Sequence, residues 1–150
     1  MSTRATYRIY DNYNNLDVYF YVHYDNYPLG AAFYFQKMVD YIRMDEAKYG
    51  RPTYAEAFFR ANKEAHFTKS HYCHGDTEYQ YNIIKRKDKG YILQAFEIGR
   101  DWKRYNEEVA QLNQGNSDPE PKIHATRKKF FEGSVEDFIK LYENKRKIRN

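Results

Sequence analysis

The sequence predicts a single α+β domain: a mainly antiparallel sheet of hairpins with about three helices packed on one face. Two observations lead to this prediction. Segments with a two-residue apolar period come in pairs joined by turn residues, which is typical of β-hairpins. Segments with three- and four-residue apolar spacing stand apart from these pairs, without the strict strand–helix alternation of a parallel α/β fold.

The first hairpin is predicted from residues 5–10 and 16–24, with a turn at 11–15 that is rich in Asn and Asp. Its second strand alternates most clearly. The side chains expected toward the core are Leu16, Val18, Phe20 and Val22, and those expected on the other face are Asp17, Tyr19, Tyr21 and His23. A face that carries Tyr and His instead of Lys and Glu is unusual.

Two helices follow this hairpin. Asp25 or Asn26 is a candidate cap for the first, which runs from Pro28 to about residue 44 with an apolar stripe. The second extends to about residue 64 and starts with Thr53 and Glu56, the spacing of a capping box.

The second half of the chain predicts another hairpin, from residues 78–83 and 91–98, with segment 99–105 extending or re-entering the sheet. A last strand is expected at 122–131, and Ser134 and Asp137 mark the start of a last helix. Residues 106–121 are predicted to be a loop that is a candidate for mobility. Residues 145–150 form a basic tail, and the whole chain 1–150 is one domain.

Composition bounds the class of protein. The mean hydropathy is −1.02, but 17 residues are Tyr, whose ring packs well in a core, so the chain is not predicted to be disordered. A net charge of +4 is too small an excess to establish an anionic partner. With a single cysteine, no apolar signal segment and no apolar run of about 18 residues, we expect a soluble, cytoplasmic protein without a membrane partner.

The strongest candidate site is an aromatic and basic surface. Arg8, Tyr10, Tyr19, Tyr21 and His23 are expected on one face of the first hairpin. Depending on strand register, this surface gains either Glu78, Gln80 and Asn82 or Tyr79 and Tyr81. The predicted binding residues are Arg8, Tyr10, Tyr19, Tyr21, His23, Asp25, Tyr27, Tyr79 and Tyr81.

Several kinds of partner fit such a surface. Tyr rings beside a guanidinium group stack nucleic-acid bases, seat a nucleotide or anchor a protein partner. The structural alternative is that helices cover this face and the Tyr rings form a second layer of the core. A homo-oligomer is also left open.

Motifs for catalysis and metal binding are absent. There is no glycine-rich phosphate loop, no nucleophile elbow and no zinc-protease motif. His66, His71, Cys73 and His74 lack the paired spacing of a structural zinc site. We therefore assign no catalytic residue, no metal and no cofactor. The remaining enzymatic hypothesis is a small hydrolase or nuclease that uses His23 with Asp25, or the loop 71–76.

Four segments, 1–6, 23–30, 75–81 and 131–139, together resemble a group of small phage and bacterial proteins. Members open with M-S-T-R-[AG]-T, carry an H-x-D-G-Y-P-like turn and a G-D-x-E-Y-x-Y strand, and close with F-E-G-S-x-x-x-F-I. Asn26 stands where the group has a glycine. The resemblance carries over no active residues, but it implies a phage, prophage or mobile-element setting.

Small accessory proteins from such settings often resemble inhibitors of host defence, which bind an immune complex or sequester a nucleotide signal. The sequence therefore predicts a phage-type binding protein in the host cytoplasm, with a host defence protein or a nucleotide as its partner. The alternatives are the hydrolase or nuclease described above and a nucleic-acid-binding protein.

Overall fold

A computed structural model describes residues 3–11, 15–49, 53–71, 77–86, 90–101, 103, 106–107, 110 and 124–149. Most of the predicted loop 106–121 lies outside these residues. So do Cys73, His74 and the side chains of the predicted basic tail.

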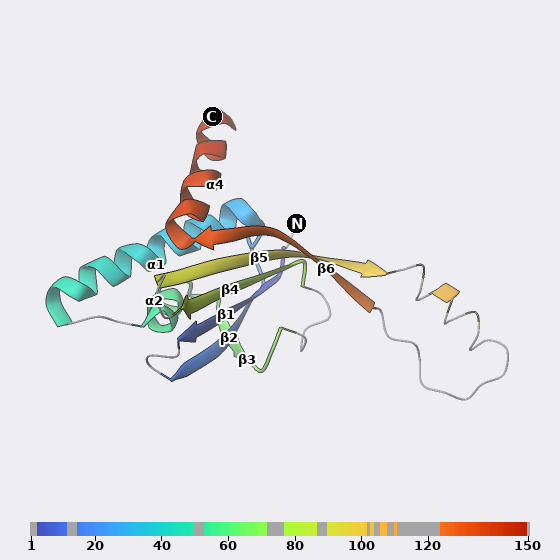
Figure 1. Cartoon of the computed structure of the whole chain (residues 1–150), viewed down its shortest axis with the longest axis horizontal. Coiled ribbons are helices and arrows are strands. Elements are labelled where there is room, and N and C mark those ends of the chain that lie inside the picture. Colours follow the sequence, from blue (N-terminus) through green and yellow to red (C-terminus); the bar gives the residue numbers. More distant parts are fainter. Residues whose placement is uncertain are drawn as a thin grey trace.

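The sheet has six strands in the order β3-β2-β1-β4-β5-β6 (Figure 1). Their bounds are β1 Ala5–Asp11, β2 Leu16–Val22, β3 His66–Thr68, β4 Tyr79–Arg86, β5 Gly90–Asp101 and β6 His124–Ser134. Both predicted hairpins are confirmed, as β1–β2 and β4–β5. Among the described strands, only β1 and β4 pair in parallel, so the sheet is mostly antiparallel as predicted. The edge strand β3 was missed, because its segment was predicted to be irregular.

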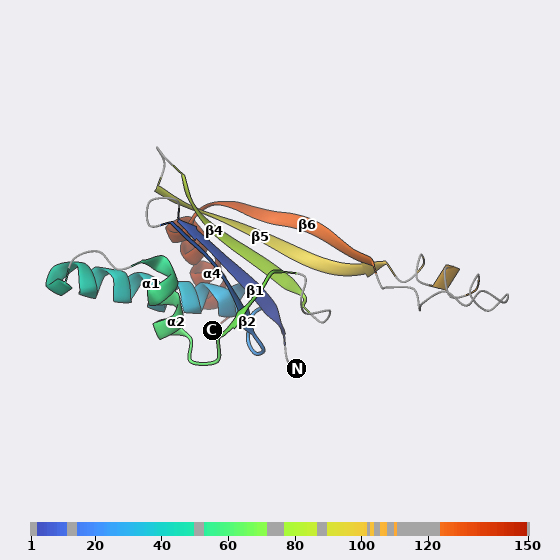
Figure 2. The ribbon, with the colours of Figure 1, turned by 90° about the horizontal axis from the view of Figure 1, so that it is seen from below.

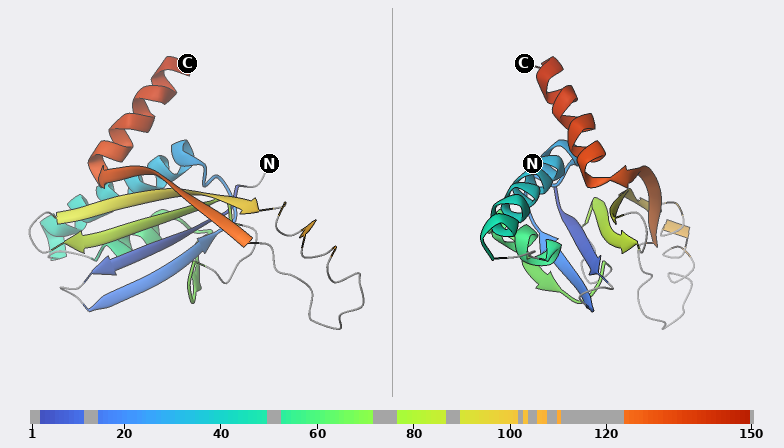
Figure 3. Two further views of the ribbon diagram at one scale, coloured as in Figure 1. Left: turned by 45° about the vertical axis from the view of Figure 1, so that its right-hand side comes forward. Right: turned by 60° about the vertical axis from the view of Figure 1, so that its left-hand side comes forward.

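The described helices α1, α2 and α4 lie on one side of the sheet (Figure 2), as the sequence predicted. Their bounds are α1 Pro28–Tyr49, α2 Tyr54–Ala61 and α4 Val135–Arg149. The C-terminal part of α4 extends beyond the sheet (Figure 3). α1 is longer than predicted, and α2 ends earlier, at Ala61.

Two of the predicted helix caps are present. The hydroxyl of Thr53 accepts a hydrogen bond from the amide of Glu56 at 3.1 Å, and Ser134 accepts one from the amide of Asp137 at 3.0 Å. The predicted cap at Asp25 or Asn26 is wrong for Asn26. The Asn26 side chain is buried, and its amide donates hydrogen bonds to the carbonyl oxygens of Thr3 and Val22 instead of serving the first turn of α1.

The turn between β2 and α1 is tightly constrained. Asp25 adopts a left-handed backbone with φ of 60°, and a Cβ added to Gly30 would lie 1.9 Å from the Asp25 carbonyl oxygen. Glycine is therefore required at position 30 by close backbone approach.

An aromatic cluster joins the sheet to the helices. Its rings belong to Tyr7 and Tyr81 in the sheet and to Phe35, Phe58 and Phe138 in the helices, and all five side chains are at most 1% exposed. Tyr7 and Tyr81 stack with ring centroids 5.0 Å apart, and Phe35 meets both edge-on at 5.8 Å. Ala5, Tyr7 and Ile9 of β1 face this core, which is the two-residue apolar period expected of a hairpin strand.

Among the described residues, no helix combines the length and the apolar composition that crossing a bilayer requires.

Candidate functional site

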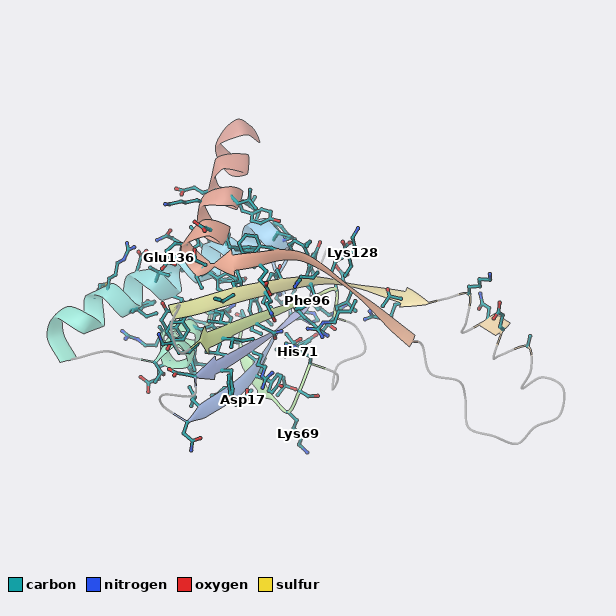
Figure 4. All side chains as sticks on the ribbon, in the orientation of Figure 1. Asp17, Lys69, His71, Phe96, Lys128 and Glu136 are labelled. Carbon is teal, nitrogen blue, oxygen red and sulfur yellow. The ribbon has the colours of Figure 1, made fainter. Side chains whose placement is uncertain are left out.

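The candidate site lies on the face of the sheet that the helices leave uncovered, which we call the open face and which Figure 1 views directly. The strand registers place alternate residues of neighbouring strands on it. These residues include Thr6, Arg8, Tyr10, Asp17, Tyr19, Tyr21, Gln80, Asn82, Gln94 and Phe96. Asp17, His71 and Phe96 mark this face in Figure 4.

Four of the predicted binding residues come together on the open face: Arg8, Tyr10, Tyr19 and Tyr21. All four are half-buried, although none of the described helices covers them. The structural alternative, in which these Tyr rings form a second core layer beneath helices, is therefore wrong for the described residues. His23 follows β2, and its Nδ1 lies 3.2 Å from the Tyr21 hydroxyl and accepts a hydrogen bond from Nε of Arg4 at 3.2 Å.

Tyr79 and Tyr81 lie on the opposite face, among the core residues. Parallel pairing sets Tyr81 beside Tyr7, so the register that brings Gln80 and Asn82 to the open face is the one adopted. Tyr81 is 0% exposed, and its hydroxyl donates to the carbonyl of Asn26 at 2.7 Å. The prediction that Tyr79 and Tyr81 belong to the binding surface therefore placed them on the wrong face of the sheet.

Asp25 and Tyr27 are exposed in the turn that leads from β2 to α1. Asp25 lies near Tyr34 of α1, where burial raises the pKa of the Tyr34 hydroxyl and the Asp25 carboxylate adds to the rise. These two predicted residues thus border the first hairpin and do not belong to its strands.

Arg8 is the best-anchored cation of the open face. Its Nε and Nη2 donate to the two carboxylate oxygens of Asp17, each at 2.9 Å. Its guanidinium group also lies over the rings of Tyr10, at 5.1 Å from the centroid, and Tyr19, at 5.5 Å. The hydrogen bond to Asp17 raises the pKa of Arg8. The side chain is therefore held in one orientation while its surroundings stay accessible.

A buried polar cluster lies beside this anchor. His71, from the segment after β3, is within 2.6 Å of both Thr6 Oγ1, at Nδ1, and Asn82 Oδ1, at Nε2. The three side chains are 7%, 0% and 6% exposed, respectively for His71, Thr6 and Asn82. An amide oxygen only accepts, so Nε2 carries the proton and Nδ1 accepts from the Thr6 hydroxyl. Both ring nitrogens of a neutral His71 imidazole are therefore hydrogen-bonded.

The Thr6–His71–Asn82 order is similar to that of a catalytic triad, but it lacks an accessible nucleophile. Because Thr6 is fully buried, no substrate reaches its hydroxyl. The cluster instead fixes the segment after β3 against β1 and β4, and the His71 ring meets the Tyr19 ring edge-on at 5.1 Å. His71 therefore helps to position the Tyr19 ring on the open face.

His23 and Asp25, the residues of the enzymatic hypothesis, would share one face only if β2 continued through them as an extended strand. β2 ends at Val22, and the left-handed backbone at Asp25 turns the chain away from an extended conformation. The two side chains therefore do not share one face of a strand. The other half of the enzymatic hypothesis, the loop 71–76, lies outside the described residues apart from His71.

Within the described part of the chain, no group of three or more His, Cys, Asp and Glu side chains is arranged to hold a metal ion. Both ring nitrogens of His71 are already within hydrogen-bonding distance of protein oxygens. Cys73 and His74 lie outside the described residues.

Sequence reasoning did not include Thr6, His71 and Phe96 among the candidate binding residues of this face. Phe96 has the guanidinium of Arg127 over its ring at 3.6 Å. The alternation in β4 and β5 would have found Phe96 once the register was known. No local sequence pattern marks His71, because its hydrogen-bond partners Thr6 and Asn82 belong to strands that are distant from it in the sequence.

Comparisons with protein-family models, with curated proteins and with solved structures find no match to this chain.

The neutral state of His71 predicts acid sensitivity. Burial lowers its pKa from 6.5 to about 4, against the raising effect of the Asn82 hydrogen bond, and Arg127 and Arg8 lower it further. The unfolded chain takes up this proton near pH 6.5 and the folded protein only near pH 4. The stabilisation is therefore complete above pH 6.5 and is lost as the pH falls to 4, by about 3 kcal/mol in total.

This expectation is checked by urea unfolding at several pH values between 4 and 7 for the wild type and for His71→Gln. The wild type should lose about 1.4 kcal/mol per pH unit more than the variant across the middle of this range. Parallel pH profiles would contradict the assignment of a neutral, buried His71.

Proposed function

We propose that this protein acts by binding a protein partner on the open face, without chemistry of its own. The observation that carries the proposal is the Arg8 anchor, a guanidinium group held by Asp17 and lying over Tyr10 and Tyr19 on the face opposite the described helices. Tyr and Arg are the residue types that most often dominate the energy of protein interfaces. Side chains that are already immobilised lose little entropy when a partner binds.

The same contacts favour a protein over single-stranded nucleic acid. Single-strand binders offer free aromatic faces on which bases stack. Here the guanidinium of Arg8 already lies over the Tyr10 and Tyr19 rings, and that of Arg127 lies over Phe96. Each guanidinium group covers one side of these rings, which leaves less aromatic surface for bases than single-strand binders offer.

The resemblance to small phage and bacterial proteins supports a narrower form of the proposal. In that setting the partner is a host protein of a defence system, and binding inhibits it. Such an inhibitor needs a stable surface and no catalytic group, which fits the open face. A sequestered nucleotide signal is the other ligand that this setting offers.

The test is capture of host proteins by the tagged full chain from a nuclease-treated lysate, followed by measurement of the affinity for the purified partner. Tyr19→Ala should weaken binding at least about tenfold. It removes a half-buried ring that contacts both the guanidinium group of Arg8 and the imidazole of His71. The matched control is Leu141→Ala, an exposed residue of α4 on the helix side. It should bind as the wild type does.

Inhibition is measured as phage plating efficiency on a strain that carries the defence system, with wild type, Tyr19→Ala and Leu141→Ala expressed in turn. Wild type and Leu141→Ala should inhibit the defence system and so raise plating efficiency. Tyr19→Ala should not raise it, provided that its circular dichroism spectrum stays native. Equal binding and protection by both variants would refute the open face as the interface. A partner captured only when nuclease treatment is omitted would indicate nucleic acid as the ligand. A nucleotide found bound by native mass spectrometry would likewise replace the protein partner with that nucleotide.

A further inference from the structure

The helix layer carries a second candidate site, on different elements from the open face. A cleft of about 560 Å³ lies between α1 and α2 and is lined by residues from both helices and from the segment after α2. Clefts of this size commonly hold small organic ligands in proteins. Its walls include the rings of Tyr34 and Tyr41 and the side chain of Met44.

Asn62, the C-terminal cap of α2, lines this cleft with one hydrogen-bond donor left over. Its amide donates to the Phe58 carbonyl at 3.1 Å, its carbonyl accepts from Ala65 at 3.2 Å, and its Oδ1 accepts from the amide of Glu64 at 3.0 Å. The bond to Oδ1 fixes the orientation of the side-chain amide. Asn62 is only 3% exposed, and its Nδ2 is buried without a partner among the described residues. The cleft is therefore bordered by a polar group whose hydrogen-bonding capacity is not satisfied within the described chain.

The charges around the cleft favour an anion. Lys37, Arg60 and Lys63 line it, against the two acids Asp40 and Glu64. Asp40 already accepts a hydrogen bond from Gln36 at 3.0 Å. No ion pair joins Lys37 or Lys63 to any described residue. The C-terminal end of α2 contributes partial negative charge, which Arg60 and Lys63 offset.

The walls favour a ligand with a flat ring. Tyr34 and Tyr41 supply aromatic surface, and the guanidinium of Arg60 lies over the Tyr41 ring at 4.5 Å. A planar ligand can stack on such surfaces while its oxyanion faces the lysines.

We propose that the cleft between α1 and α2 binds a small organic anion with a planar ring, whose oxyanion lies beside the basic side chains of the cleft. Aromatic carboxylates and nucleoside monophosphates share this chemistry. The proposal is independent of the protein partner on the open face.

Titration of the full chain with adenosine monophosphate, 4-hydroxybenzoate and inorganic phosphate, followed by nuclear magnetic resonance, tests this site. At least one of the two organic anions should bind saturably and shift the side-chain amide signal of Asn62. Inorganic phosphate, which lacks a ring, should bind at least about tenfold more weakly. The organic anion that binds more tightly decides between the carboxylate and the phosphate.

Asn62→Asp is the sharpest variant. It keeps an acceptor for the amide of Glu64 but replaces the free donor with a carboxylate, so affinity should fall at least about tenfold. Lys63→Gln changes an exposed side chain and should weaken binding severalfold without affecting the fold. Lys140→Gln, also exposed but on α4, is the matched control and should bind as the wild type does.

Three results would each overturn the proposal. The first is that neither organic anion binds the wild type below about 10 mM. The second is that Lys63→Gln binds like Lys140→Gln, which decides the matter even if Asn62→Asp fails to fold. The third is that the shifted signals come from Tyr10, Tyr19 and their neighbours on the open face.

Discussion

Replacing Phe35 with Ala is expected to lower the free energy of unfolding by about 3–5 kcal/mol. The side chain is 0% exposed and lies at the centre of the aromatic cluster. Its ring centroid is 5.8 Å from both Tyr7 and Tyr81 of the sheet and 5.7 Å from Phe138 of α4. Truncation removes buried apolar surface and leaves a cavity between all three helices and the sheet, and rigid rings on every side limit its collapse.

Urea unfolding followed by circular dichroism measures this loss. Phe33→Ala is the matched control, because it makes the same change in the same helix at a side chain that is 47% exposed. Phe33 contacts the ammonium group of Lys37 at 4.7 Å from the ring centroid, so a loss below about 1 kcal/mol is expected. Similar losses for the two variants would show that α1 does not dock on the sheet as described.

The parts of the fold that depend on local pattern could be predicted from the sequence. Alternation in residues 16–22 placed Phe20 and Val22 toward the core, because side chains of a strand point to opposite faces in turn. Thr53 and Ser134 marked helix starts correctly, since a hydroxyl before a helix accepts from an amide of its first turn.

Strand neighbours far apart in the chain were beyond such reasoning. The parallel pairing of β1 with β4 joins strands separated by β2, α1, α2 and β3, and no local residue pattern specifies it. The face on which Tyr79 and Tyr81 lie depends on this register, because a shift of one residue turns every side chain to the opposite face. The candidate site was therefore predicted for the first hairpin and misassigned for β4.

Burial of polar groups was the other limit. Asn is a common helix cap, so Asn26 was predicted to serve α1. In the folded chain it is 0% exposed, and its Nδ2 lies 2.8–2.9 Å from the carbonyl oxygens of Thr3, Val22 and Tyr24. Its Oδ1 accepts from the Tyr7 hydroxyl at 2.5 Å. Burial raises the pKa of Tyr7, which keeps this hydroxyl protonated as a donor.

Asn26→Ala is accordingly expected to cost about 3–5 kcal/mol of unfolding free energy, because it leaves several buried polar groups without partners at once. Urea unfolding again measures the loss. Tyr7→Phe is the graded comparison, since it removes only the hydroxyl and keeps the stacked ring, and it should cost about 1–2 kcal/mol. Combining the two substitutions should cost less than their sum, because both remove the same hydrogen bond.

Asn26→Gly separates the side chain from the backbone as the cause. If the backbone of the turn decided the residue at position 26, glycine would be well tolerated there. However, the left-handed residue of the turn is Asp25, and Asn26 has no positive φ that glycine would relieve. Asn26→Gly should therefore destabilise the protein at least as much as Asn26→Ala. A glycine variant clearly more stable than the alanine variant would show that the backbone of the turn, and not the buried amide, decides the residue at position 26.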